Sequence, residues 1–580
     1  MAVLTQYTWI IAVISIAFCG SSFGNGANDV ANSYATSVAA RTLTMVQVGC
    51  LSMVTEFFGA VVLGSRVTST IKNGIIGLDR FRQTPSTLML AMGCAEFASA
   101  GWLLIATRLG YPVSTTQTIV GALVGVGIAA EASVSWGWKD GSVSQIAASW
   151  AIAPCIAAVF GAVLFGSLKF AVLERQNSFE KAMKAIPFYL AFTAAVLALF
   201  ITVEAPGAPS LEALGATAAG IVLGVFFGIL LLSYVFFVPY VHRRLVTKDT
   251  RIRLRHIFLG PLLYMENPPI YLPAKGNEIV IDYYANTESD SAEKTDDIEK
   301  AKPAEKANKG DKTDDNSDTP ASAPLSLEDV ERGKSATQSG GLVGRYKKQP
   351  EPEERFLAPT AHLPIHNPRR VWSFIKYFFL QGVTRDCVTH ASAQLSEVHS
   401  KSKQYDNRIE HLWTYAQVAS AIMMSIAHGS NDVANAVGPF IAAYDTWKTG
   451  EVREKGESPI WILIVAGILL GLGFWFQGHH IIKAMGNKIT QISPTRGFAM
   501  EPGAAITVLL ASRLGLPVST TQCLTGSVIG VAMTGLDFGA VNWRQVAFIF
   551  SGWLITLPCA GLVGGLLMAM SLNTPQFGQG

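Results

Sequence analysis

A polar sequence occurs twice in this chain, each time inside a segment that is otherwise apolar and rich in glycine. Gly-Ala-Asn-Asp-Val-Ala-Asn at residues 26–32 returns about 400 residues later as Gly-Ser-Asn-Asp-Val-Ala-Asn at residues 429–435. A second pair, residues 106–126 and 511–531, is identical at 13 of 21 positions without a gap. Two motifs repeated in the same order indicate an internal duplication. Polar groups inside apolar spans are unfavourable, and they are retained mainly where they bind a ligand or line an aqueous cavity.

The composition is that of a polytopic membrane protein. Of the 580 residues, 50% are hydrophobic and only 15% are charged, and the mean hydropathy is +0.33. Outside one charged central segment, the chain is a series of apolar runs, each close to the length of about 20 residues that a helix needs to cross a bilayer. The net charge of +3 does not indicate a nucleic-acid partner. We predict about twelve spans, at residues 6–24, 43–64, 86–107, 114–130, 145–170, 186–203, 215–240, 411–443, 458–477, 500–511, 517–534 and 546–571.

The first polar motif falls in the first predicted span and its copy falls in the eighth. Seven spans, an odd number, precede the second copy, so the two copies are expected to cross the membrane in opposite directions. In such an inverted repeat, related and interrupted helices meet at a binding site near the midplane. We therefore predict an all-α polytopic membrane protein of four parts: a first membrane repeat at 1–170, two bridging spans at 171–240, a hydrophilic and largely disordered central loop at 241–410, and a second membrane repeat at 411–580.

The central loop carries the information on membrane orientation. Residues 285–356 are rich in Lys, Glu, Asp, Ser and Pro, a composition that cannot bury a core. Six basic residues precede this segment, between 243 and 255, and by the positive-inside rule they place the loop in the cytoplasm. The basic residues of the loop after the second span favour the opposite orientation, but the larger cluster outweighs them. Residues 371–384 are apolar but short, so they either lie along the membrane surface or pack on the helix bundle.

The Asn-Asp motifs are suited to binding a hard cation. Asn28, Asp29 and Asn32 present side-chain oxygens on one or two helical turns, and the second copy repeats this arrangement with Asn431, Asp432 and Asn435. The glycines at the start of each motif are expected to let the helix unwind, so that backbone carbonyls join the site. Two aspartates near the membrane midplane are tolerable only with cations between them or with protons.

The Pro-Val-Ser-Thr-Thr-Gln segments supply the complementary site, for an anion. Pro112 and Pro517 fit the start of a helix, where free N–H groups and the positive end of the helix dipole attract negative charge. The alternative is that small polar residues merely allow close helix packing, but the presence of two matched copies favours binding. The predicted donors are Ser114, Thr115, Thr116 and Gln117 with Ser519, Thr520, Thr521 and Gln522.

Three further acidic residues fall in apolar sequence. Glu96 and Glu501 each lie 18 residues before the serine of the repeated motif, and they are candidates for sodium ligands or for locking the structure around that motif. Glu56 has no acidic counterpart, because Leu470 occupies the matching position. An unpaired buried acid is either a coupling or proton-sensing group, or a carboxyl group hydrogen-bonded to a neighbouring helix.

Other residues offer little chemistry. The seven cysteines are scattered without metal-ligand spacing, and we predict that they are unpaired core residues. His479 and His480 lack the frame of a metal-binding helix, so no transition metal is expected. Arg108 and Arg513 either draw an anion inward or extend to the lipid head groups. No Walker loop, zinc motif or Ser-His-Asp arrangement is found, so the chain is not expected to be an enzyme.

The four motifs together resemble those of the inorganic phosphate transporter family, most closely its fungal sodium–phosphate symporters of the plasma membrane. The resemblance covers residues 5–170 and 411–571. It implies a twelve-span inverted-repeat fold, often dimeric, in which a transport domain moves against a scaffold. It also implies that phosphate and sodium bind at the paired motifs, with Asp29 and Asp432 contributing to both.

The expected function is therefore sodium-coupled symport of phosphate across the plasma membrane, with sodium as co-substrate and no cofactor. Proton coupling through Glu56, Asp29 or Asp432 is an alternative, and so is transport of a related oxyanion such as sulfate. The aspartates favour phosphate, because hydrogen phosphate can donate a hydrogen bond to a carboxylate and sulfate cannot. A receptor that senses phosphate without transporting it is the alternative of a different class.

Overall fold

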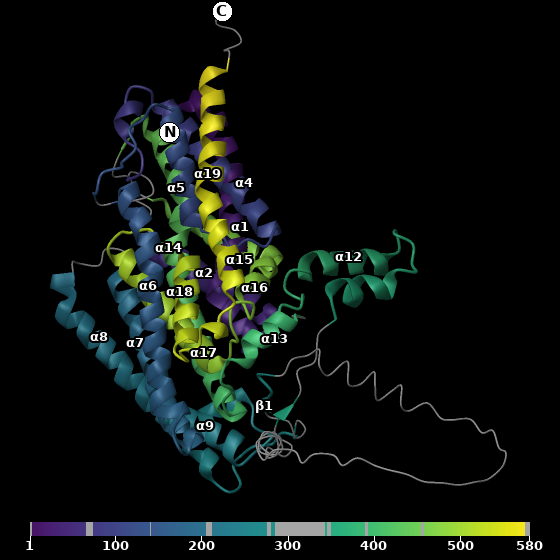
Figure 1. Cartoon of the computed structure of the whole chain (residues 1–580). Coiled ribbons are helices and arrows are strands. Elements are labelled where there is room, and N and C mark those ends of the chain that lie inside the picture. The colour runs from purple at the N-terminus through teal and green to yellow at the C-terminus, as the bar shows by residue number, and fades with distance from the viewer. Residues whose placement is uncertain are drawn as a thin grey trace, which may run out of the picture.

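The computed structural model describes residues 3–64, 74–139, 141–204, 211–274, 280–284, 343–344, 350–388, 392–453 and 458–574. These residues are nearly all helical, and the helices stand together as one elongated bundle with α12 projecting from its side (Figure 1). The predicted disordered segment falls mostly outside the described residues. The two strands found in the described part, β1 (Val280–Ile281) and β2 (Val343–Gly344), form a short parallel pair.

The first half of the chain supplies the helices of the first repeat and the two bridging helices. In order these are η1 (Thr5–Tyr7), α1 (Thr8–Ala39), α2 (Met45–Phe58), η2 (Gly59–Leu63), η3 (Leu78–Phe81), α4 (Pro85–Arg108), α5 (Thr115–Ala129), α6 (Val143–Leu168), η4 (Lys169–Leu173), α7 (Ser178–Glu204), α8 (Leu211–Leu232), η5 (Ser233–Phe237), α9 (Val238–Val241) and η6 (His242–Val246).

The second half contains shorter elements followed by the second repeat. The flanks of the predicted central loop form η7 (Leu254–Tyr264), η8 (Glu353–Leu357), η9 (Ala358–Thr360), α12 (Pro368–Leu380) and α13 (Ala393–Ser400). The second repeat consists of α14 (Asn407–Thr449), α15 (Ile460–Gln477), α16 (His479–Met485), α17 (Pro494–Arg513), α18 (Thr520–Met533), η10 (Phe538–Ala540) and α19 (Trp543–Asn573).

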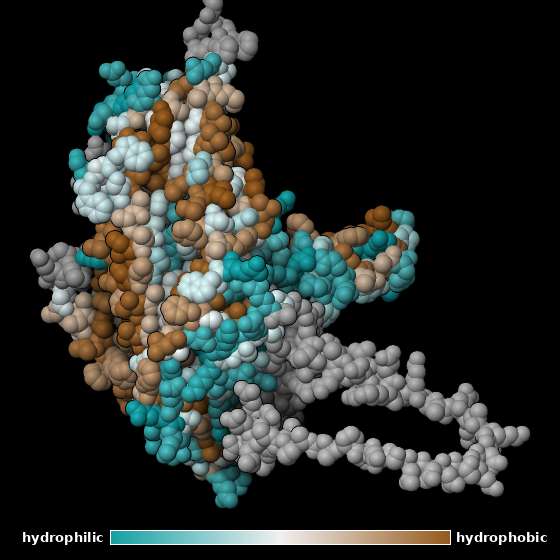
Figure 2. Space-filling model, viewed as in Figure 1, coloured by the Kyte–Doolittle hydropathy of each residue, from teal (hydrophilic) through white to brown (hydrophobic). Residues whose placement is uncertain are grey.

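Eight helices among the described residues are long and apolar enough to cross a membrane, which confirms the predicted class of fold. Apolar side chains cover much of the outer face of the bundle (Figure 2). The predicted spans at 114–130 and 517–534 form α5 and α18, which have only 15 and 14 residues. At 1.5 Å per residue they are about 21–22 Å long, shorter than the hydrocarbon core of about 30 Å.

Each short helix instead forms a hairpin with the helix before it: α4 packs on α5, and α17 packs on α18. The turns are built alike, because Gly110 and Gly515 occupy equivalent positions and both have positive φ, of 73° and 68°. Glycine adopts this left-handed conformation without the strain that a Cβ atom would cause. The interruption of the helices therefore lies in these hairpin turns.

The central helices α1 and α14 lie side by side and run in opposite directions. Near one end, Trp447 Nε1 on α14 donates a 3.2 Å hydrogen bond to Oγ1 of Thr8, the first residue of α1. Further along, Phe18 stacks on Phe440 with ring centroids 4.6 Å apart. Contacts that move forward along α1 and backward along α14 require an antiparallel pair, in agreement with the predicted inverted topology.

The two repeats are interleaved in space. The last helix of the second repeat, α19, packs against α5 of the first hairpin, and α6 of the first repeat packs against α18 of the second hairpin. Similarly, α15 packs against α1, and α2 packs against α14. The boundaries of the sequence repeats are therefore not boundaries between separately packed units.

All seven cysteines are unpaired, as predicted, but they do not all lie in the core. Cys94, Cys387 and Cys523 are buried, whereas three others, Cys19, Cys50 and Cys155, are exposed on the outer face. Small apolar side chains can face hydrocarbon in a membrane protein, so an apolar environment does not require burial within the chain.

Candidate functional site

The antiparallel crossing of α1 and α14 brings the two Asn-Asp motifs to the same level of the bundle. Asn25 Nδ2 donates a 2.7 Å hydrogen bond to the backbone carbonyl of Asp432, which joins the two motifs directly. One oxygen of Asp29, one oxygen of Asp432 and a ring nitrogen of His428 all lie within 4.8 Å of one another. Asp29 is 1% exposed and Asp432 is 0% exposed, so this centre is closed to solvent.

The tips of the two helical hairpins meet at this centre. Ser114 caps the N-terminus of α5, and Ser519 caps that of α18, each by accepting a hydrogen bond from the N–H three residues later. Thr116 Oγ1 donates to the carbonyl of Val518 at 3.0 Å, and Thr521 Oγ1 donates to the carbonyl of Val113 at 3.1 Å. The hairpins therefore face each other, and the N-terminal ends of both helices converge on the site.

Each aspartate is held by the hairpin of its own repeat. Thr115 donates to Asp29 Oδ2 from its hydroxyl at 2.8 Å and from its backbone N–H at 3.3 Å. In the second repeat, Thr520 Oγ1 donates to Asp432 Oδ2 at 2.8 Å. Asp29 Oδ1 also lies 3.2 Å from Thr521 Oγ1 of the other hairpin, whose one hydroxyl hydrogen is shared between this carboxylate and the carbonyl of Val113. Each carboxylate thus occupies the positive end of a helix.

The last asparagine of each polar motif connects it to the hairpin of the other repeat. Asn32 Nδ2 donates to Thr521 Oγ1 at 2.8 Å, and Asn435 Nδ2 donates to Thr116 Oγ1 at 3.0 Å. The earlier asparagines of the two motifs, Asn28 and Asn431, differ more from each other in their hydrogen-bond partners. Asn28 binds the backbone and Thr107 of the first hairpin, whereas Asn431 donates to Asp432 Oδ1 and to the carbonyl of Val518.

Several buried acceptors at this centre receive no hydrogen bond from the described residues. The side-chain carboxamide oxygens concerned belong to Asn25, Asn32, Asn431, Asn435, Gln117 and Gln522. Buried polar atoms in native proteins are nearly always partnered. Oxygen acceptors without donors, next to two carboxylates, are a donor set that suits hard cations such as sodium.

His428 links the site to Glu56, which lies on α2. His428 Nδ1 is 2.7 Å from Glu56 Oε2, and His428 Nε2 is 2.9 Å from Asp432 Oδ2. Ser425 Oγ also donates to Glu56 Oε1, at 2.6 Å. All four side chains are fully buried. The imidazole of His428 therefore lies between Glu56 and Asp432, one of the two aspartates of the site.

His428 and Asn25 are site residues that were not predicted from the sequence. They occupy equivalent positions, directly before the glycine of each repeated motif. A titratable residue inside an apolar span was the signal available for His428. The repeat obscured it, because neither residue is matched in the other half: His428 of the second repeat has Asn25 as its counterpart, and Glu56 of the first repeat has Leu470.

Glu96 and Glu501 lie outside this cluster and differ from each other. Glu501, on α17, accepts hydrogen bonds from Thr36 at 2.6 Å and Ser37 at 2.7 Å, both on α1, and from Ser420 on α14. It connects the second hairpin to both central helices. Glu96, on α4, is fully buried, and neither of its oxygens has a hydrogen-bond partner among the described residues.

The expected unwinding at the glycine-rich motifs is wrong. Both α1 and α14 are continuous α-helices through residues 26–32 and 429–435. The backbone carbonyls of these turns therefore take part in the hydrogen bonds of the helices, and the site is made mainly of side chains. The polar side chains have partners on the hairpin tips, so the helices do not need to open to satisfy them.

Comparison with known proteins agrees with this geometry. Residues 25–564 match the family model described as "Phosphate transporter family". The chain belongs to this family. The match includes both polar motifs and both hairpins, which confirms the resemblance found in the motifs.

Relatives of this family member cover its whole length. The phosphate-repressible phosphate permease pho-4 of Neurospora crassa is 36% identical, over 99% of both chains. Sodium-dependent phosphate transporter 2 of Felis catus is 28% identical, over 97% of this chain and 98% of the relative. A solved structure titled "The sodium-dependent phosphate transporter" has 25% sequence identity and a TM-score of 0.62, and covers 97% of this chain. These relatives are transporters and permeases, not enzymes.

Proposed function

We propose that this phosphate transporter family member is a symporter that couples sodium to inorganic phosphate and works by alternating access. The observation that carries the proposal is the meeting of Asp29 and Asp432 between two converging helix N-termini. Two unit charges that lie within 4.8 Å of each other repel by at least about 3.5 kcal/mol at an effective dielectric constant of about 20. A cation between them removes this repulsion.

Sodium is the cation that this donor set favours. The Asn-Asp motifs and the two glutamines supply neutral oxygen acceptors without donors beside the carboxylates. We propose Asn28, Asp29 and Asn32, with Asn431, Asp432 and Asn435, as the sodium ligands. For Glu501 the contacts with α1 and α14 favour the locking role, and Glu96 stays a candidate ligand.

Phosphate is proposed to bind at the hairpin tips, between Ser114–Gln117 and Ser519–Gln522. The N–H groups and hydroxyls at a helix N-terminus stabilise an oxyanion. At present Asp29 occupies this position as an internal anion, because Thr115 donates to it twice. Sodium bound to Asp29 and Asp432 would compete for these carboxylates and free the threonine donors for phosphate. Sodium should therefore bind before phosphate.

The occluded arrangement is consistent with alternating access. The site residues of both hairpins are at most 4% exposed, so neither side of the membrane has access to them. Because each hairpin is held by the central helix of the other repeat, the movement of one hairpin tip alone would open one side. The driving force is the sodium gradient together with the membrane voltage, about 2.3 kcal/mol per net charge per 100 mV.

Proton coupling is a second candidate, and the Glu56–His428–Asp432 contacts favour it. A histidine between two carboxylates can hold or pass a proton where a sodium ion would otherwise be required.

The test is uptake of radiolabelled phosphate into proteoliposomes under an inward sodium gradient or an equal proton gradient, with excess sulfate as competitor. Sodium-dependent uptake that resists sulfate and is lost in Asp29→Asn and Asp432→Asn supports the proposal. The control is Asp79→Asn, since Asp79 is an exposed carboxylate that pairs with Arg82. Uptake driven by a proton gradient alone would mean that phosphate transport is coupled to protons bound by the carboxylates and not to sodium. Phosphate binding without uptake under either gradient would identify a receptor instead.

We further propose a plasma-membrane location, a cytoplasmic central loop and a homodimer. The basic cluster between 243 and 255 supports the orientation of the loop. Protease accessibility of the loop in sealed cells tests its side, and cross-linking in native membranes tests the dimer. Cleavage of the loop by a protease added outside the cells would show that the loop lies outside, and it would contradict the proposed orientation.

A further inference from the structure

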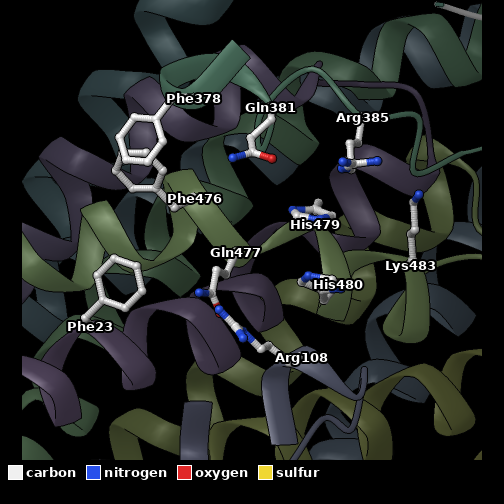
Figure 3. Close-up of a pocket in the computed structure, with 10 residues that line it drawn as sticks. All are labelled: Phe23, Arg108, Phe378, Gln381, Arg385, Phe476, Gln477, His479, His480 and Lys483. Atoms are coloured by element: carbon white, nitrogen blue, oxygen red, sulfur yellow. The ribbon is translucent and has the colours of Figure 1, made fainter. Parts of the chain in front are cut away.

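A cavity of about 760 Å³ lies beside the first hairpin, and none of the residues proposed for sodium or phosphate lines it. Its walls come from α1, α4, α15, α16 and the chain from Phe378 to Arg385. Figure 3 shows the rings of Phe23, Phe378 and Phe476 on one side, and Arg385, His479 and Lys483 on the other. The cavity therefore has an aromatic half and a cationic half.

The cationic half holds Arg108, Arg385 and Lys483 around two histidines. Burial lowers the pKa of His480, and the positive charges of Arg385, Lys483 and Arg108, which line the same cavity, lower it further. Arg385 also pairs with Glu353 at 2.6 Å and with Glu351 at 3.6 Å, but neither glutamate lines the cavity. Arg385 and Lys483 thus have interaction partners, but no acidic residue is among the residues that line the cavity, so the lining itself is positively charged.

Two buried polar atoms in the wall have no partner among the described residues. They are Nδ1 of His479, a side chain that is 8% exposed, and Oε1 of Gln477. Positive charge with unused hydrogen-bonding atoms is suited to an anion that carries several oxygens and hydroxyl groups.

Helix α12 indicates the depth of the cavity in the membrane. It projects sideways from the bundle (Figure 1), and none of its residues is buried. Its apolar side chains, Val371, Trp372, Phe374, Ile375, Phe378 and Phe379, form one stripe at helical spacing. The opposite face carries Arg369, Arg370 and Lys376. A basic amphipathic helix of this kind lies in the plane of the membrane interface.

This helix joins the bundle at the cavity. Trp475 Nε1 donates a 2.6 Å hydrogen bond to the carbonyl of Phe379, and Phe378 packs against Phe476 with ring centroids 5.7 Å apart. An interfacial α12 therefore places the cavity at the level of the phospholipid head groups, where basic pockets between helices bind phosphate-bearing lipids.

We propose that this cavity is a second phosphate-recognition site, in which Arg108 and Lys483 bind the phosphate group of an anionic phospholipid or of free inorganic phosphate. Arg108 ends α4, six residues before Ser114 at the hairpin tip. A ligand that bridges Arg108 and α16 ties the first hairpin to its surroundings, so occupancy should alter the rate of transport.

The test uses the purified full-length protein and two probes. The lipid probe is dioctanoyl phosphatidylinositol 4-phosphate, compared with dioctanoyl phosphatidylcholine by native mass spectrometry. The free-ion probe is radiolabelled phosphate in equilibrium binding to the Asp29→Asn/Asp432→Asn protein, in which the central site is disabled. The cavity is altered by Arg108→Gln with Lys483→Gln. The matched control is Arg513→Gln, because Arg513 is the counterpart of Arg108 and does not line the cavity.

We expect the cavity variant to weaken binding of one probe by about tenfold or more, since two charged contacts are removed, and Arg513→Gln to leave it unchanged. Loss of the lipid identifies a head-group site, and loss of the residual phosphate identifies a site for the free ion. If the cavity variant does not fold, Gln381→Glu adds a negative charge to the same lining and should also reduce binding. The proposal is overturned if binding of neither probe responds to any of these changes.

Discussion

Asn32 donates a 2.8 Å hydrogen bond to the hydroxyl of Thr521, a residue 489 positions further along the chain. The second repeat forms the equivalent bond, from Asn435 to Thr116 at 3.0 Å. Each polar motif thus holds the hairpin tip of the other repeat. A change at one hairpin should therefore affect the central helix that carries the polar motif of the other repeat.

Breaking this bond should loosen the second hairpin. We expect Asn32→Ala and Thr521→Val each to lower stability by about 1–3 kcal/mol, because both leave a buried polar partner unsatisfied. The double variant should lose less than the sum, with a coupling of at least about 0.5 kcal/mol. Thermal unfolding in detergent measures these losses. Thr525→Val is the control, since its hydroxyl bonds only within α18; additive losses would contradict the direct contact.

The losses of uptake caused by changing His428 and by changing Glu56 should not be additive, because the two side chains contact each other. His428→Asn restores the residue type of Asn25, but it leaves Glu56 and Asp432 as buried carboxylates without their shared partner. Breaking a buried charged pair costs about 3–5 kcal/mol. We expect at least a tenfold fall in the uptake rate, and a double variant with Glu56→Gln that is less impaired than the two single effects combined.

The control for this cycle is His411→Asn, on the same helix but in contact with Tyr283 rather than with the site. Initial rates of phosphate uptake at saturating sodium are the measurement. Equal losses in the His428 and His411 variants would mean that His428 acts only in folding.

Glu501 and Glu96 form a matched pair with opposite expectations. Glu501→Gln replaces a carboxylate that accepts hydrogen bonds from Thr36, Ser37 and Ser420, so the second hairpin should lose about 2 kcal/mol or more of stabilisation. Glu96→Gln removes a buried carboxylate that lacks protein donors and should change stability by less than about 1 kcal/mol. Melting temperatures of the two variants decide the matter, and a larger loss for Glu96→Gln would refute this assignment.

Close helix packing at Gly26 should not tolerate a methyl group. A Cβ atom there would lie 1.9 Å from the carbonyl oxygen of Leu470 on α15, so α1 and α15 would have to separate. We expect Gly26→Ala to destabilise the protein by about 1–3 kcal/mol or more. Gly101→Ala is the control, because nothing lies within 4 Å of its Cβ position, and alanine there should be neutral or stabilising by up to about 1 kcal/mol. Folded yield and melting temperature in detergent test both variants.

The class of fold and the residues of the candidate site could be predicted from the amino-acid sequence alone. Apolar runs fixed a helical membrane protein, because an unpaired backbone is not tolerated in hydrocarbon. The repeated motifs identified Asp29, Asp432 and the Ser-Thr-Thr segments, since a duplication retains the same polar residues twice. The helix starts at Ser114 and Ser519 were also predictable, because capping depends on residues only three positions apart.

How these parts meet could be learned only from the three-dimensional arrangement of the helices. Thr521, the partner of Asn32, and Thr36 and Ser37, two partners of Glu501, lie more than 400 positions away from them in the chain, and no local pattern specifies such contacts. The same holds for the interleaving of the repeats, for the continuous path of α1 and α14, and for His428 between Glu56 and Asp432. These features arise from side-chain packing between whole helices, and that packing turns two similar halves into one asymmetric site.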